Sequence, residues 1–169
     1  TARDLEVDVA ILHGPSGCSF KHARLLEEDG MRVLTTSLAD HEFIFGGQEP
    51  LERVLRYAEE HFNPRRMAVV GTCVSMIIGE DLKSAVNHSG ISTPTIAIEI
   101  HAGFPENIEG VIATLEPAAE AGWITMEELE RQKYLLGMAN EVERLRGAAS
   151  KPYIEPSRGD LKHQVARRL

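Results

Sequence analysis

The stretch VDVAILHGPSGC, residues 7–18, decides the fold of this chain. Its apolar first half predicts a buried β-strand, and the Gly-Pro-Ser-Gly turn that follows ends on Cys18. The one other cysteine of the chain, Cys73, also follows an apolar run, residues 67–70, and a glycine. We therefore expect the two thiols of the protein at the ends of two strands.

The sequence alternates between strand and helix patterns. Apolar runs predict strands at about 7–12, 32–36, 67–71 and 95–100, and helical patterns lie at about 19–29, 49–62, 79–88 and 106–121. The segment Ser37–Gly47 is expected to be a long turn, with Pro50 at the first position of the helix after it. This β-α-β-α order predicts an α/β fold, a parallel sheet of about four strands with helices on both faces.

The pattern changes after Gly122. Thr125 and Glu128 form a capping-box signature, and apolar residues recur at helical spacing from there to about residue 146. Prolines and a glycine then suggest an extended arm, and a short helix is expected at 160–168. We thus expect an α/β domain over 1–122 and a C-terminal helical extension with an arm over 123–169. Because the chain starts at Thr1 and not at Met, we also expect a fragment of a longer protein.

Composition narrows the class of protein. The 169 residues suit one main domain, and 43% of them are hydrophobic. Lys and Arg total 18 against 26 Asp and Glu, a formal net charge of −8 that argues against a nucleic-acid-binding protein. No apolar run approaches the ~20 residues of a membrane span, and two cysteines do not make a disulfide framework. We expect a cytoplasmic protein that binds neither nucleic acid nor membrane.

Cys18 and Cys73 are candidate metal ligands. Ligands of open α/β sheets gather at the carboxyl ends of the strands, and both cysteines precede predicted helices whose N–H groups favour a thiolate. Each cysteine can equally be a small buried core residue. Their spacing of 55 residues excludes a CxxC pair. An iron–sulfur cluster takes four thiolates, which two identical subunits would supply together.

Candidate proton donors lie on the same rim of the sheet. They are His13, His41 and His101, with Asp40 and Glu42 on either side of His41. Each histidine can donate a proton or can simply hold a loop through hydrogen bonds. The motifs GxxxxGK[ST], GxGxxG and GxSxG are absent, so the sequence offers no phosphate-binding loop and no nucleophile elbow.

Three segments resemble motifs of nitrogenase component 1 and its relatives. They are HGPSGC at 13–18, LADHEFIFGGQ at 38–48 and TCVSMIIGEDL at 72–82, and a Gly103-Phe104 pair follows them as in the family. The resemblance covers roughly residues 7–110. It implies the first Rossmann-like domain of a nitrogenase-type subunit.

Within this family, residues 13–38 resemble subunits of the reductive cyclases that act on Ni-sirohydrochlorin a,c-diamide, in biosynthesis of the nickel tetrapyrrole of methanogenesis. The resemblance implies a nitrogenase-like oxidoreductase subunit and a homodimer with a [4Fe-4S] cluster at its interface. Cys18 and Cys73 would be cluster ligands, two from each subunit. The other implied partners are Ni-sirohydrochlorin a,c-diamide as the substrate and an ATP-dependent iron–sulfur reductase, similar to the nitrogenase Fe protein, as the electron donor.

Further residues near the cysteines have expected roles. The backbone N–H groups of Gly17, Gly46 and Gly47 are expected to donate hydrogen bonds to cluster sulfur. His41, Asp40 and His13 are expected to supply the protons that accompany the electrons.

The chain also departs from nitrogenase proper. It has no cysteine nearer the N-terminus than Cys18, and Val74 stands where the family has proline. Family subunits continue into further α/β domains, so we expect this fragment alone to be inactive. Two alternatives stay open, a nitrogenase-like reductase of another substrate and a non-catalytic module that binds a tetrapyrrole or a partner.

Overall fold

The computed structural model describes residues 1–28, 30–100 and 107–150. His101, the Gly103-Phe104 pair and the predicted arm and helix beyond residue 150 lie outside the described residues. The chain divides into two compact units, Thr1–Leu129 and Glu130–Leu169. The first unit contains the sheet and both cysteines.

Four strands form one parallel sheet, which confirms the prediction. They are β1 (Val9–His13), β2 (Arg32–Thr35), β3 (Met67–Gly71) and β4 (Thr95–Ile98), in the order β2-β1-β3-β4. β1 pairs in parallel with both β2 and β3, so that Val9 lies opposite Arg32 on one side and Met67 on the other. All residues of β1 are buried, whereas both ends of the edge strand β2 are exposed. A central strand of this kind needs apolar side chains on both faces, which explains the run at 7–12.

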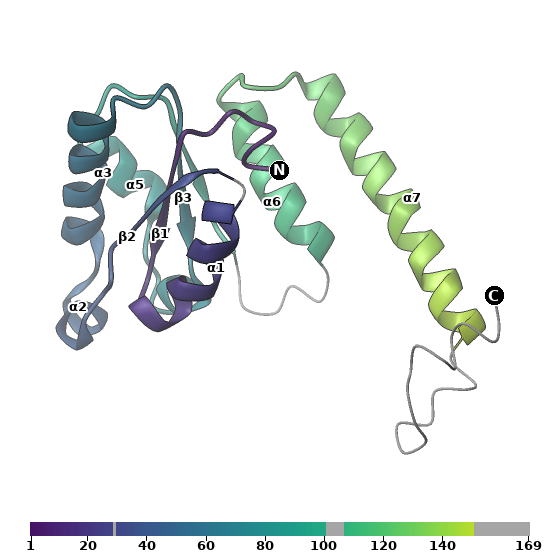
Figure 1. Cartoon of the computed structure of the whole chain (residues 1–169), viewed down its shortest axis with the longest axis horizontal. Coiled ribbons are helices and arrows are strands. Elements are labelled where there is room, and N and C mark those ends of the chain that lie inside the picture. Colours follow the sequence, from purple (N-terminus) through teal and green to yellow (C-terminus); the bar gives the residue numbers. More distant parts are fainter. Residues whose placement is uncertain (29, 101–106, 151–169) are drawn as a thin grey trace, which may run out of the picture. The chain divides into compact units, whose positions relative to one another are not determined.

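Helices cover both faces of the sheet (Figure 1). The helices of the described residues are α1 (Ser16–Glu28), α2 (Asp40–Phe45), α3 (Gln48–Phe62), α4 (Cys73–Ile77), α5 (Leu82–His88), α6 (Asn107–Glu120) and α7 (Met126–Ser150), and α7 belongs mostly to the second unit. α3 and α5 pack together on one face, and α1 and α6 lie on the other. Right-handed crossovers require α1 to lie on the face opposite α3 and α5, because the connection from β1 to β2 runs in the opposite direction to the connections that lead to β3 and β4. The predicted fold class is therefore confirmed.

The main core lies between the sheet and the pair α3 and α5. Its fully or almost fully buried side chains are Val9, Ile11, Leu51, Leu55, Ala58, Met67, Val69, Leu82, Ala85 and Ala97. Strand residues two apart point to the same face, so alternate residues of β1 and β3 line one side of this core. Helix residues three or four apart line the other side. The core thereby holds β1 and β3 next to each other.

Two helix boundaries near the strand ends differ from the prediction. α1 begins at Ser16, so Cys18 lies within its first turn and not before it. The helix predicted at 79–88 begins only at Leu82, as α5, and the short helix α4 before it was not predicted. Gly79 lies between α4 and α5 in a left-handed conformation with φ 81°, which ends the first helical segment. Asp81 then caps α5 by accepting the N–H of Ser84 at 2.8 Å.

The segment predicted as a long turn contains α2. The Glu42 carboxylate reaches back over the first turn of this helix and accepts the N–H of Ala39 at 2.6 Å. Gly47 then precedes α3, which begins at Gln48, so Pro50 is the third helical residue and not the first. Proline fits there because the N–H groups of a first helical turn have no acceptor within the helix.

α7 extends past the predicted helix end at about residue 146 and runs to Ser150. The N–H of Glu128 donates to the hydroxyl of Thr125 at 3.1 Å, which is one half of the predicted capping box. Within the described ranges, no helix combines the length and the apolar character needed to cross a membrane.

Candidate functional site

The loops that follow the two central strands, β1 and β3, lead to opposite sides of the sheet. From β1 the chain passes to β2 on one side, and from β3 it passes to β4 on the other. Loops that leave neighbouring parallel strands in opposite directions open a crevice at the carboxyl end of the sheet, where ligands of such folds bind. Cys18 follows β1 and Cys73 follows β3, so the two cysteines flank this switch point.

Direct contacts join the two cysteine loops. The carbonyl oxygen of His13 accepts the N–H of Thr72 at 3.0 Å and also lies 3.0 Å from the hydroxyl of Ser75. Gly14 approaches Thr72 so closely that a Cβ atom at Gly14 would overlap the Thr72 side chain. Because Thr72 and Ser75 lie on either side of Cys73, these contacts fix its loop against the segment that leads to Cys18.

The two thiols differ in their exposure. Cys18 is half-buried in the first turn of α1, Cys73 is exposed as the first residue of α4, and both are free of disulfide bonds. Thr72 caps α4, and its hydroxyl accepts the N–H of Ser75 at 3.4 Å. Across the part of the chain that the structure describes, no group of three or more His, Cys, Asp or Glu side chains is placed to hold a metal ion. The metal-ligand role expected of Cys18 and Cys73 stays a prediction.

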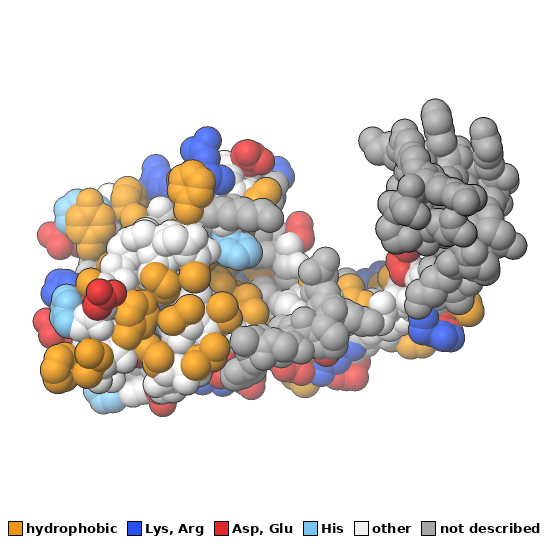
Figure 2. Space-filling view, turned by 90° about the horizontal axis from the view of Figure 1, so that it is seen from below, with side chains coloured by type: hydrophobic (Ala, Val, Ile, Leu, Met, Phe, Trp, Pro, Cys, Tyr) orange, Lys and Arg blue, Asp and Glu red, His pale blue; other side chains and the backbone are white. Residues whose placement is uncertain are grey.

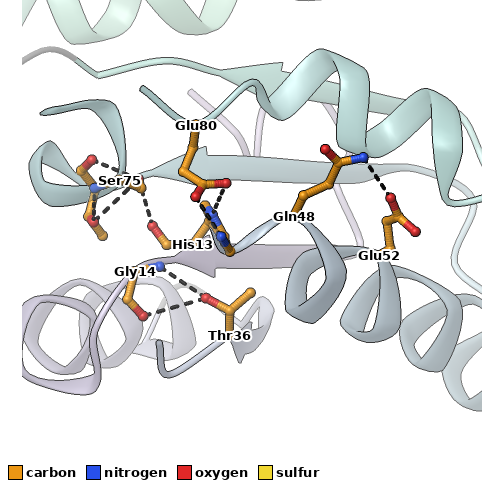
Figure 3. Close-up of polar contacts among 9 residues, drawn as sticks. His13, Gly14, Thr36, Gln48, Glu52, Ser75 and Glu80 are labelled. Atoms are coloured by element: carbon orange, nitrogen blue, oxygen red, sulfur yellow. Dashed lines mark hydrogen bonds and ion pairs between the residues drawn. The ribbon is translucent and has the colours of Figure 1, made fainter. Parts of the chain in front are cut away.

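A buried histidine and a carboxylate meet at the same end of the sheet (Figure 3). His13 is fully buried at the end of β1, and its Nε2 lies 3.5 Å from Oε2 of Glu80, whose side chain is 9% exposed. The other carboxylate oxygen of Glu80 accepts the N–H of Gly47 at 2.6 Å. A Cβ atom at Gly47 would lie 2.9 Å from Cε1 of His13, so glycine lets this turn pack on the ring. Glu80 thus joins the end of β1, the turn before α3 and the loop after α4.

Burial sets the charge state of His13. It lowers the pKa of His13 below the ordinary value of 6.5, because a charged imidazolium would lose its hydration there. The carboxylates of Glu80 and Glu42 favour the charged form, but their effect is smaller than that of burial. Neither ring nitrogen has a hydrogen bond of good geometry within the described residues, since 3.5 Å is long for one. The proton-donor role expected of His13 stays a prediction, and burial disfavours the imidazolium form.

The other two expected proton donors have a different setting. Asp40 and His41 open α2 and are exposed, and Nε2 of His41 lies 3.8 Å from a carboxylate oxygen of Glu42. His41, Glu42 and Glu80 are among the residues that line a surface hollow of about 740 Å³ between α2, α3 and the loop before α5. Glu80 therefore contacts this hollow on one side and buried His13 on the other.

Two of the three glycines expected to bind a cluster already use their N–H groups within the chain. The N–H of Gly46 donates to the carbonyl oxygen of Glu42 at 2.9 Å, and that of Gly47 donates to Glu80. Gly17 lies in the first turn of α1, where an N–H group has no acceptor in the helix. Hydrogen bonds from these glycines to cluster sulfur stay a prediction.

Glu80 is the residue of this site to which sequence reasoning gave no role. The sequence gives only a weak indication of a role for Glu80. It is an acidic residue just after Gly79, in a segment of mostly apolar and small residues. Its partner His13 is remote in the sequence. The two come together only because β1 and β3 pair in a register that sets His13 opposite Gly71.

A protein-family model matches the part of the chain that carries the sheet and both cysteine loops. Residues 4–121 match the family of nitrogenase component 1 type oxidoreductases. This chain belongs to that family. The match confirms the resemblance shown by the three sequence motifs.

Two similar proteins are components of reductive cyclase complexes. The chain is 57% identical over 169 residues to component CfbD of the Ni-sirohydrochlorin a,c-diamide reductive cyclase complex of Methanosarcina acetivorans, over 100% of this chain and 46% of that protein. It is 54% identical over 171 residues to component CfbD of Methanothermobacter thermautotrophicus, over 100% of this chain and 48% of that protein. The chain thus spans about half the length of these curated relatives.

More distant relatives are nitrogenases. The molybdenum-iron protein alpha chain of Clostridium pasteurianum is 30% identical over 114 residues, 61% of this chain and 21% of that protein. The solved structure of nitrogenase Cp1 at pH 6.5 superposes with a TM-score of 0.60 at 20% identity, over 69% of this chain and 28% of that one. Likeness at this identity concerns the fold alone, and it agrees with the α/β sheet described above.

Proposed function

We propose that this chain is part of a nitrogenase-like subunit of a Ni-sirohydrochlorin a,c-diamide reductive cyclase, in which Cys18 and Cys73 supply half the ligands of a [4Fe-4S] cluster shared by two copies. The observation that carries the proposal is the placement of both cysteines at one switch point, on loops bonded to each other. The choice of substrate rests on the 57% identity to a CfbD component, against 30% to a nitrogenase alpha chain.

The ligand set fits an iron–sulfur cluster that one chain cannot complete. Thiolates are the usual ligands of such clusters, and a cubane takes four. The chain contains two cysteines in all. Two copies about a two-fold axis supply four. When bound, the cluster accepts and passes on single electrons.

The end of the sheet that carries the cysteines also exposes large apolar side chains. Phe20 of α1 is 70% exposed, Phe45 of α2 is 86% exposed and Ile77 of α4 is 73% exposed. Figure 2 looks at this end of the molecule and shows hydrophobic side chains gathered on it. Exposed apolar faces mark interaction surfaces. We assign this face to a second copy of the chain, because the half-set of thiolates needs one.

The remaining residues have supporting roles in the proposed reaction. An ATP-dependent iron–sulfur reductase is the electron donor, and the tetrapyrrole receives electrons together with protons. His41 and Asp40 are exposed, so they exchange protons with water and are the more accessible donors. Ser75 and His13 are buried and hold the cysteine loops together. Since the chain covers about half of its relatives, we propose that it does not turn over substrate alone.

Anaerobic reconstitution of the purified chain with iron and sulfide tests the ligand assignment. We expect about four iron atoms for every two chains and a visible charge-transfer absorption. The variants Cys18→Ala and Cys73→Ala should each lose most of this iron, because each removes two of the four thiolates of a dimer.

Ser92→Ala is the matched control for these variants. Ser92 is exposed and precedes β4 at the opposite end of the sheet, so this variant should bind as much iron as the unchanged chain. Full iron binding by the double variant Cys18→Ala/Cys73→Ala would disprove the ligand assignment. A cluster held by a chain that sedimentation shows to be monomeric would disprove the sharing between copies.

A further inference from the structure

The two oxygens of the Glu80 carboxylate face two different neighbours. Its Oε1 accepts the N–H of Gly47 at 2.6 Å. Its Oε2 faces Nε2 of His13 at 3.5 Å, and Figure 3 shows these two side chains pointing toward each other. An ionised carboxylate accepts hydrogen bonds and donates none. A neutral imidazole carries one proton, and the nitrogen that faces a carboxylate is the favourable place for it.

We propose that Glu80 is a positioning residue of the cysteine site, which fixes buried His13 as the Nε2–H tautomer and holds the turn before α3 against the end of β1. That this arrangement serves a metal site rests on the function proposed above. The tautomer and the position of the turn do not depend on that function.

His13 connects this arrangement to the cysteine loops. Its carbonyl oxygen accepts the N–H of Thr72, directly before Cys73, while its ring lies beside both Glu80 and Gly47. A movement of the ring away from Glu80 would leave a nearly buried carboxylate without this partner, which is unfavourable. The position of Glu80 is therefore coupled to the backbone atom that holds the Cys73 loop.

His13 and Glu80 are both shielded from water, so the protein and not the solvent determines which ring nitrogen of His13 carries the proton. Nε2–H towards Glu80 leaves Nδ1 as an acceptor, and Nδ1 is buried with no hydrogen bond in the described part of the chain. Glu42 on α2 is the other carboxylate that acts on His13, but one of its oxygens already accepts the N–H of Ala39. Glu80 therefore decides which ring nitrogen carries the proton.

The variant Glu80→Gln separates this role from that of a simple structural contact. Glutamine keeps the size of the side chain and one oxygen for the N–H of Gly47. Its NH₂ group then faces Nε2 of His13 and must donate to it, so the ring has to change to the Nδ1–H tautomer. Nitrogen-15 NMR of the histidine rings in the metal-free chain reports the tautomer, with His13 assigned through its backbone resonances.

We expect the Nε2–H form in the unchanged chain and the Nδ1–H form in Glu80→Gln. Glu49→Gln is the matched control, because Glu49 is an exposed carboxylate that lines the same hollow, and it should leave the Nε2–H form in place. An Nδ1–H form in the unchanged chain would overturn the proposal, and so would one tautomer common to all three proteins. If Glu80→Gln does not fold, the tautomer of His13 in the unchanged chain still tests the proposal.

Hydrogen exchange of the Gly47 amide tests the hold on the turn. Glu80→Ala removes the acceptor, so this amide should exchange about tenfold faster, whereas Glu80→Gln should keep it protected. Equal exchange in all three proteins would overturn the positioning role. Both measurements use the metal-free chain, so a failure of the cluster assignment in the iron experiment remains separate from a failure here.

Discussion

The hydroxyl of Ser75, in α4, lies 3.0 Å from the carbonyl oxygen of His13, the last residue of β1. The same hydroxyl lies 2.9 Å from the carbonyl oxygen of Thr72, and Ser75 is fully buried. One side chain thus links the helix that begins at Cys73 to the strand that leads to Cys18.

Ser75→Ala should lower the free energy of unfolding by about 1 kcal/mol. The loss stays moderate because the N–H of Thr72 still satisfies the carbonyl oxygen of His13. Urea denaturation measures the change. The exposed Ser92→Ala variant should stay within about 0.5 kcal/mol of the unchanged chain. A Ser75→Ala variant as stable as this control would contradict the link.

Gly47→Ala should destabilise the chain by about 1–3 kcal/mol, because the added Cβ would lie 2.9 Å from atoms of both His13 and Leu38. Gly110→Ala should have the opposite effect. Gly110 lies within α6 with no atom near its missing Cβ, so alanine there should add up to about 1 kcal/mol through helix propensity. Thermal or urea unfolding of the two variants measures the difference, and effects of equal sign would argue against the packing of this turn.

His13 should make the free energy of unfolding depend on pH. Its pKa is lowered in the folded chain, mainly by burial, so the unfolded chain binds a proton more readily. The contribution of His13 to stability is fully present above its ordinary value of 6.5 and is lost as the pH falls towards the pKa of the folded state.

Urea unfolding at a series of pH values below neutral measures this dependence. The His13→Asn variant should lose less stability than the unchanged chain over the same range. His61→Asn, which changes an exposed histidine at the end of α3, should keep the dependence of the unchanged chain. Equal slopes for all three proteins would show that His13 ionises alike in the folded and unfolded chain.

Phe45→Ser should weaken self-association. Phe45 is 86% exposed, so the substitution should change the stability of a single chain little. Burial of one phenylalanine side chain in an interface is worth about 1.5–3 kcal/mol, and a two-fold dimer contains two copies of it, so Kd should rise by roughly a hundredfold or more. Analytical ultracentrifugation measures it, with the half-exposed Leu25→Ser near the other end of α1 as a control. An unchanged Kd would remove this face from the proposed interface.

The sheet could be predicted from the sequence because β1 is buried on both faces and therefore shows an uninterrupted apolar run. Because the ends of β1 and β3 could be predicted, the positions of Cys18 and Cys73 just beyond these strands could be predicted too. The short helix α2 was missed, since six residues are too few for a helical period and its first turn depends on the local contact of Glu42 with Ala39. The pair of His13 and Glu80 could not be predicted, because it arises from strand register and not from a local pattern.

The register of β1 against β3 also has a consequence for the course of folding. Val9 lies opposite Met67, so this pairing closes a loop that contains β2 and three helices. Contacts between residues so distant in the chain form slowly, because the entropy of loop closure must be overcome first. Cys18 and Cys73 remain apart until β3 pairs with β1. Under the proposed ligand assignment, iron would bind only after this late step of folding.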